Sequence, residues 1–298
     1  MNSQQADDLW LHFLPLWQEW TSIITVQHIL VAGGYGLFLK QRGILNHPTT
    51  TIMVPISDWR DATPRVTKDV DLLIGLDLIA DKTAQAHMLA TLTKHHFTVS
   101  ELHPRWQFIK KISNHRSVIV ELHAPQPSAE RPQLQADNRR VKRRPSLGNQ
   151  GIHARTNPEA IGCDLHPSSV TVDGIVLLLP NSFTWSVMKL TAAHQRWAIA
   201  QNDQKSADDR AFARSQAIKH AQDVCRIIAM MTRDEGDRAL SVSKQFHHTP
   251  AFTVACDAVA HAFSGDQSWA PALVAEYWRD TDFALIRSTL ATWFQLPQ

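Results

Sequence analysis

Apolar residues recur at helical spacing in some stretches of this chain and at strand spacing in others. Large apolar side chains near the N-terminus predict an amphipathic helix, and the run HILVA predicts a short buried strand. The expected order up to residue 123 is helix 6–24, strand 28–32, helix 35–41, strand 69–76, helix 78–96 and strands 108–112 and 117–123. Helices and strands mixed in this way predict an α/β (α+β) module, in which helices flank a mixed sheet.

The second half of the chain changes character. Residues 124–167 are rich in Pro, Gln, Asn and Arg with little periodicity, which predicts a long loop or a partly disordered insertion. The stretch VTVDGIVLLLP predicts a hairpin that turns at Asp173-Gly174. Helical spacing then dominates, first over 182–200 and 206–231. We therefore expect an α/β domain over residues 1–180, with a long basic loop at about 124–167, and a helical domain over 181–298.

Composition narrows the class of protein without naming a partner. Of the 298 residues, 44% are hydrophobic, which is enough for a sizeable core, and the formal net charge of +2 favours no charged partner. Three scattered cysteines form no CxxC pair, which argues against a disulfide framework and fits a reducing compartment. The polar, acidic start MNSQQADDLW is unlike a secretory signal, and no apolar run is long enough to span a bilayer. We expect a cytoplasmic protein with no membrane partner.

Acidic residues stand on two of the expected strands. In a strand, residues two apart point to the same face, so Asp69 and Asp71 project together while Val70 points into apolar packing. Glu121 stands in the same way within SVIVELH. If the two strands are neighbours, three carboxylates converge on one side of the sheet.

Such a cluster needs a counter-charge. Crowded carboxylates repel one another, and divalent cations relieve that repulsion. Carboxylate oxygens suit Mg²⁺ or Mn²⁺, which also bind substrate phosphates. The sequence therefore indicates Asp69, Asp71 and Glu121 as metal ligands and catalytic residues. The alternative is that D-x-D, a common pattern, only marks solvated aspartates at an edge strand or turn.

A pair of glycines suggests a phosphate site. Gly33 and Gly34 follow a buried strand and open a helix, where backbone amides and the helix N-terminus favour anions. A tight turn without a ligand is the alternative interpretation. A dinucleotide-binding G-x-G-x-x-G is excluded because the third glycine is missing, and the chain has no Walker A motif, HExxH or G-x-S-x-G.

Together, AGGYGLFL, RVTKDVDLLI and VIVELH resemble the nucleotidyltransferase superfamily typified by DNA polymerase β. Within it, the first two segments are most similar to the AbiEii-type toxins and their uncharacterised relatives. There a basic residue and a threonine commonly precede the acidic pair, as Arg65 and Thr67 do here. The resemblance implies a nucleotidyltransferase-like mixed sheet followed by helices. It also implies that Gly33, Gly34, Arg65 and Thr67 bind a nucleoside triphosphate.

The likeness continues into the helical region. The segment SFTWSVMKLTAAHQR resembles the family's Lys-Leu helix, and KHAQDVCRI resembles the helix after it. By this resemblance Lys189 contacts the triphosphate and Asp223 supports the site. Lys189 and Arg196 share one helical face with Ala193, which suits a basic surface facing phosphates. His220 stands where the family usually has an acid.

Three functions remain open. The first is metal-dependent transfer of a nucleoside monophosphate from an NTP to a hydroxyl of RNA, protein or a small molecule, with an antitoxin protein as a partner if the chain is an AbiEii-like toxin. The second is a catalytically inactive nucleotide- or RNA-binding protein of the same fold. The third is an RNA-binding adaptor that uses the basic run RRVKRR at 139–144, whose alternative role is a solvated loop.

Overall fold

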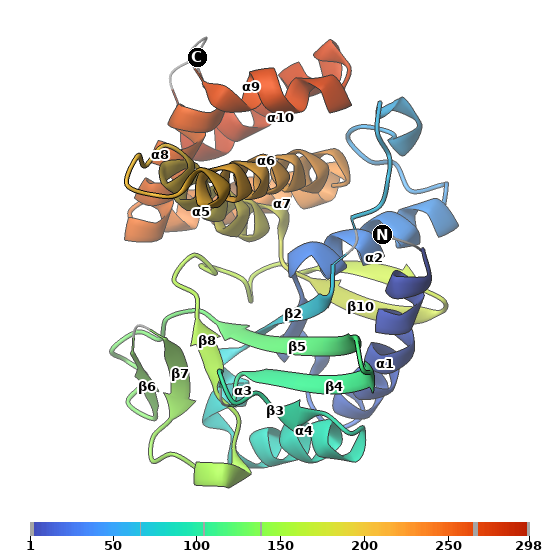
Figure 1. Ribbon diagram of the computed structural model, residues 1–298, viewed down its shortest axis with the longest axis vertical. Helices are drawn as coiled ribbons and strands as arrows, with labels where there is room; N and C mark the ends of the chain where they lie inside the picture. Colours follow the sequence, from blue (N-terminus) through green and yellow to red (C-terminus); the bar gives the residue numbers. More distant parts are fainter. Residues whose placement is uncertain (1–2, 66, 104, 138, 265–267, 297–298) are drawn as a thin grey trace. The chain divides into compact units, whose positions relative to one another are not determined.

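The computed structural model describes residues 3–65, 67–103, 105–137, 139–264 and 268–296 (Figure 1). Val66, inside the segment that carries the acidic pair, lies outside the described residues. The predicted fold class is confirmed, because helices surround a mixed sheet and further helices follow. Contacts divide the chain into two compact units, residues 1–43 with 64–180 and residues 44–63 with 181–298. Among the described residues, no helix is long and apolar enough to cross a membrane.

The first unit is built on an eight-stranded sheet. Its helices are α1 (Ser3–Thr21), α2 (Gly33–Asn46), α3 (Leu76–Ala80) and α4 (Lys82–Lys94). The sheet strands are β1 (Ile29–Val31), β2 (Asp69–Ile74), β3 (Thr98–Val99), β4 (Gln107–Ser113), β5 (Arg116–Ala124), β6 (Leu134–Ala136), β7 (Arg140–Arg143) and β8 (Ala154–Thr156). The strand order is β1-β2-β5-β8-β7-β6, and β4 pairs with β5 and β3. The β2–β5 and β5–β8 pairs are parallel, and the other pairs are antiparallel.

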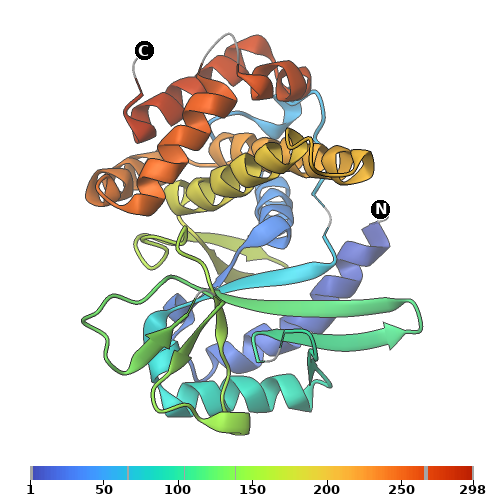
Figure 2. The ribbon, with the colours of Figure 1, turned by 60° about the vertical axis from the view of Figure 1, so that its left-hand side comes forward.

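One face of this sheet is apolar across β2, β5, β7 and β8. The side chains that share this face are fully or almost fully buried, namely Val70, Leu72, Val118, Val120, Leu122, Val141 and Ala154. Residues between them along β2, β5, β7 and β8 point to the opposite face, because side chains alternate in a strand. The candidate chemistry lies on that opposite face. The long β4–β5 hairpin and the parallel β2 are prominent in Figure 2.

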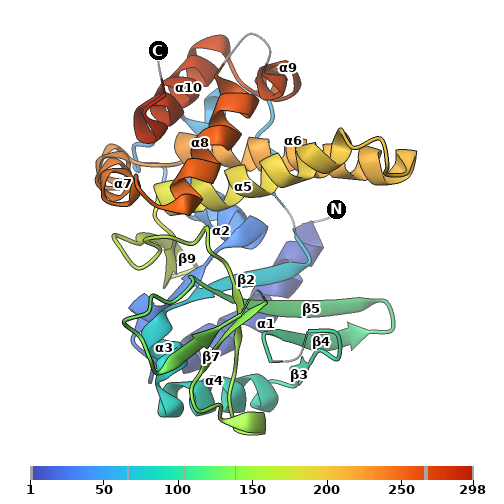
Figure 3. The ribbon, with the colours of Figure 1, turned by 90° about the vertical axis from the view of Figure 1, so that its left-hand side faces the viewer.

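The region 124–167 differs from the sequence prediction. It is not one long loop, since β6, β7 and β8 lie in it and extend the sheet beside β5 (Figure 3). The basic run 139–144 is correspondingly not a mobile loop, because four of its residues form β7. Val141 and Ala154 pair across the strands and are fully buried. One buried residue in each short strand is too weak a pattern to show periodicity in the sequence.

One other expected element comes out differently in detail. The single helix expected over 78–96 is two helices, α3 and α4, and Asp81 separates them. The Asp81 side chain accepts hydrogen bonds from the amides of Thr83 and Ala84, which caps α4. The hairpin at Asp173-Gly174 is confirmed. It joins β9 (Ser168–Val172) to β10 (Ile175–Leu179), and both turn residues have positive φ, at 50° and 79°.

The second unit is helical. Its helices are α5 (Ser182–Ala200), α6 (Ala207–Ala229), α7 (Arg233–Phe246), α8 (Pro250–Phe263), α9 (Trp269–Val274) and α10 (Asp280–Phe294), and α5 and α6 lie side by side. Residues 44–63, which the sequence analysis placed in the first domain, belong to this unit. Their backbone holds them there, since the amides of Met53 and Val54 donate to the carbonyls of Met231 and Ala229. The ring of Trp59 packs 4.9 Å from that of Trp278.

Candidate functional site

The register of two parallel strands brings together acidic residues that are far apart in sequence. Asp71 on β2 lies directly opposite Glu121 on β5, and Asp69 lies opposite Ile119. The neighbouring Val70 and Val120 are fully buried on the other face. All three carboxylates predicted from the sequence therefore stand on the same face of the sheet.

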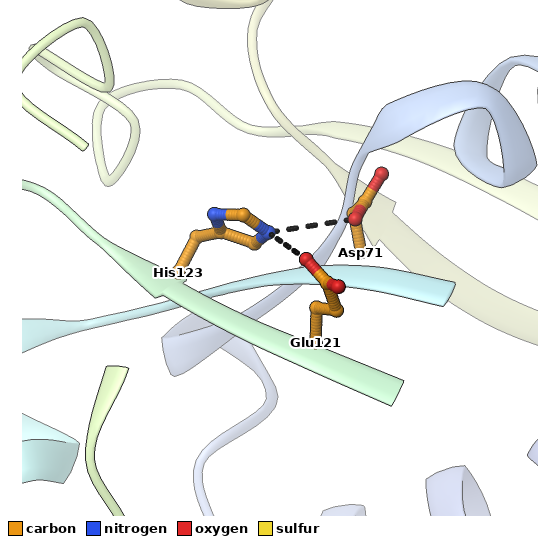
Figure 4. A group of neighbouring side chains, drawn as sticks. All are labelled: Asp71, Glu121 and His123. Carbon is orange, nitrogen blue, oxygen red and sulfur yellow. Dashed lines mark ion pairs between the residues drawn. The ribbon is translucent and has the colours of Figure 1, made fainter. Parts of the chain in front are cut away.

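A histidine completes the closest group, which Figure 4 shows. His123 Nε2 lies 3.4 Å from Asp71 Oδ1 and 3.5 Å from Glu121 Oε2. One ligand atom from each of the three residues lies within 4.8 Å of the others, so the group fits a metal ion. His123 is not among the residues predicted from the sequence. The signal was present, because His123 follows Glu121 by two residues in a strand and so must share its face.

Neighbouring polar groups fix two of the carboxylates. The Gln107 side-chain amide, on β4 opposite Glu121, donates to Glu121 Oε1. The Thr67 hydroxyl donates to Asp69 Oδ1. Asp69 is therefore held beside the group of Asp71, Glu121 and His123 rather than within it.

The charges in this group are strongly coupled. Burial and the Asp71 charge raise the pKa of Asp69 despite the hydrogen bond from Thr67. Burial also opposes ionisation of Glu121, but the nearby His123 ring and the hydrogen bond from Gln107 outweigh it and lower the Glu121 pKa. Burial disfavours the charged ring of His123, yet its close approach to the Asp71 and Glu121 carboxylates, 3.4 and 3.5 Å away, raises its pKa to about 9. The carboxylates thus demand a positive charge among them, which a proton on His123 or a metal ion supplies.

The predicted glycine turn lies against the same carboxylates. Gly33 begins α2 with φ +64°, and a Cβ atom built on it would overlap the Asp71 carboxylate. The Ala32 amide donates to the Asp71 carbonyl at 2.8 Å. A Cβ atom on Gly34 would lie 3.4 Å from Arg65 Nε and 3.4 Å from Thr67 Cβ. The first turn of α2, a helix of 14 residues, therefore lies next to Arg65 and the acidic residues.

Lys189 and Asp223 belong to the second unit and contact each other. The Lys189 amine lies 2.8 Å from Asp223 Oδ2, and their side chains are 10% and 1% exposed. The expectation that Lys189 and Arg196 present one basic surface is wrong, because Lys189 is buried while Arg196 is exposed. The buried carboxylate of Asp223 accounts for the position of the lysine.

Basic residues continue the polar face of the sheet beyond β5. Arg155 on β8 pairs with His123 on one side and with Arg140 on β7 on the other. Lys142 is two residues beyond Arg140 and shares its face. A row of positive side chains thus begins beside the acidic group and runs across β8 and β7.

Comparison with protein-family models, with curated proteins and with solved structures finds no significant match to this chain.

Proposed function

We propose that this protein is a metal-dependent nucleotidyltransferase that moves a nucleoside monophosphate from an NTP to an acceptor hydroxyl. One observation carries the proposal. Carboxylates from two parallel strands meet the glycine-opened N-terminus of α2, where Gly33 touches Asp71. A metal-binding group and an anion-binding helix terminus in contact suit a metal-bound triphosphate.

The residues have distinct roles in this proposal. Asp69, Asp71 and Glu121 would hold divalent metal, which when bound would favour ionisation of the acceptor hydroxyl and stabilise the leaving pyrophosphate. The amides at Gly33 and Gly34, with the Arg65 guanidinium, bind the phosphates that leave. The acceptor oxygen forms a bond to the α-phosphorus as the bond between the α-phosphorus and the bridging oxygen breaks. The acceptor proton passes to solvent.

The basic row supports a polyanionic acceptor such as RNA. Arg155, Arg140 and Lys142 follow the acidic group on the same face of the sheet, so an acceptor backbone bound there would reach the carboxylates with one end. Lys189 has no phosphate-binding role in the proposal, because its amine pairs with the buried Asp223.

A second candidate function is nucleotide binding without transfer. Its specific support is His123, since a protonated ring between Asp71 and Glu121 neutralises part of their charge without any metal. Such a protein would bind NTP at α2 and transfer nothing.

The test is label transfer from each of the four radiolabelled NTPs to bulk RNA, with Mg²⁺ or Mn²⁺ present. The wild type and a Glu101→Gln control, altered at an exposed acid, should transfer label, whereas an Asp69→Asn, Asp71→Asn double variant should not. Calorimetry with each NTP separates the two candidates. Binding without transfer by the wild type supports the second function, and equal transfer by wild type and double variant refutes the first.

A further inference from the structure

The position of His123 carries information about which metal the site selects. Its Nε2 atom points between the Asp71 and Glu121 carboxylates, 3.4 and 3.5 Å from their nearest oxygens (Figure 4). The three side chains come from adjacent strands in fixed register, and Gln107 holds Glu121 from a third strand. The group is therefore positioned by the sheet and not by a loop.

The two distances match one coordination geometry better than another. Two ligands of a tetrahedral ion with bonds of about 2.0–2.2 Å lie about 3.3–3.6 Å apart, the range in which both nitrogen–oxygen distances fall. Adjacent ligands of octahedral Mg²⁺, with bonds of about 2.0–2.1 Å, lie only about 2.9 Å apart. Both nitrogen–oxygen spacings thus suit a tetrahedral ion, for which these three side chains would leave one position open.

The donor set leads to the same choice. Imidazole nitrogen is a ligand for zinc and other first-row transition ions, whereas Mg²⁺ takes oxygen ligands. The His123 side chain is only 12% exposed, and within the described part of the chain neither ring nitrogen forms a well-shaped hydrogen bond. A buried polar ring of this kind calls for a further partner, and a metal ion at Nε2 would be one.

We propose that His123 is a metal ligand and that Asp71, Glu121 and His123 form a tetrahedral site for Zn²⁺ or a similar first-row transition ion in preference to Mg²⁺. This inference rests on the metal dependence in the proposed function. It replaces the magnesium expected from the carboxylates alone and assigns the selectivity to a single imidazole.

The test uses Co²⁺ as a spectroscopic probe of the metal-free full-length protein, with no nucleotide present. We expect the intense visible absorption bands of tetrahedral Co²⁺ on the wild type, at one ion per chain. Zn²⁺ should abolish these bands at equal concentration, and Mg²⁺ should leave them unchanged even in large excess. His123→Gln should weaken Co²⁺ binding at least about tenfold, because a ligand is lost. His115→Gln, an identical change at an exposed histidine of the β4–β5 hairpin, should bind as the wild type does.

Several outcomes would overturn the inference. These are weak octahedral-type bands on the wild type, displacement of Co²⁺ by an equal concentration of Mg²⁺, or unchanged affinity in His123→Gln. The first two need only the wild type, so a variant that fails to fold leaves the inference falsifiable. Tetrahedral Co²⁺ in a protein that transfers no label would refute the proposed function alone. Label transfer with Mg²⁺ in a protein whose Co²⁺ bands are octahedral would refute this inference alone.

Discussion

The buried ion pair between Lys189 and Asp223 gives the sharpest stability prediction for the second unit. Asp223→Asn keeps the shape of the side chain and removes the negative charge 2.8 Å from the lysine amine. With the two side chains 10% and 1% exposed, water cannot replace the lost partner. Removing one member of a buried pair costs about 3–5 kcal/mol, and we expect a loss of this size in the free energy of unfolding.

A pair of similar length on the surface provides the control. Arg238 and Asp234 in α7 lie 2.7 Å apart, but their side chains are 50% and 69% exposed. Exposed pairs four residues apart in a helix contribute about 0.3–0.5 kcal/mol. Because Asp234 also lies in the first turn of α7, Asp234→Asn should cost at most about 1 kcal/mol.

Urea unfolding followed by far-ultraviolet circular dichroism measures both losses, and hydrogen exchange of peptides from α5 and α6 locates them. A double variant, Lys189→Met with Asp223→Leu, should be more stable than Asp223→Asn, since no unpaired charge remains. Similar losses for Asp223→Asn and Asp234→Asn would refute this reasoning. So would an Asp223→Asn variant of normal stability that has lost NTP binding, which would restore the phosphate-binding role of Lys189.

Three further predictions concern the first unit. Gly33→Ala and Gly174→Ala both place a side chain at positive φ. This strains the backbone and should lower the free energy of unfolding, measured in urea, by about 1–2 kcal/mol. Gly33→Ala should lose more stability than Gly174→Ala and should also weaken Co²⁺ binding, because its Cβ overlaps Asp71 whereas Gly174 faces open space. Equal losses of stability in the two variants would contradict this. Burial, helped by nearby Arg and Lys charges, lowers the pKa of His153 to about 4, below its unfolded value of about 6.5. The neutral ring therefore contributes fully to the stability of the folded state above pH 6.5, and this contribution is lost as the pH falls towards 4. His153→Gln should therefore lose about 2 kcal/mol less stability than the wild type between pH 7.5 and 5, and parallel pH profiles would count against it. Arg155→Gln should weaken RNA binding and lower the slope of log affinity against log salt by about one, and an unchanged slope would exclude a phosphate contact there.

Local elements of this fold could be read from the sequence. Helix α5 begins and ends at the residues that its periodicity predicts, and the Asp173-Gly174 turn needs only residues that accept positive φ. Strand alternation likewise showed that Asp69 and Asp71 share one face. In each case the signal lies within a few neighbouring residues.

Other features depend on contacts between distant residues. The sequence alone did not predict that β2 pairs with β5, because register is set by packing of the whole sheet. It predicted only that the carboxylates would converge if the two strands were neighbours. Strands β6 to β8 bury too few side chains to produce a pattern. Residues 44–63 join the second unit partly through backbone hydrogen bonds, which no side-chain pattern records. His123 could have been found, had the two-residue period been followed past Glu121.

The alternation along β5 limits how this chain can change length. Inserting or deleting one residue just before Glu121 would turn Glu121 and His123 towards the face of the fully buried Val70 and Leu72 and would bring Leu122 out onto the face of Asp71. Changes of two residues would preserve the facing and only move the ligands along the strand. The parity of a length change in β5, more than its size, therefore decides whether the metal ligands survive.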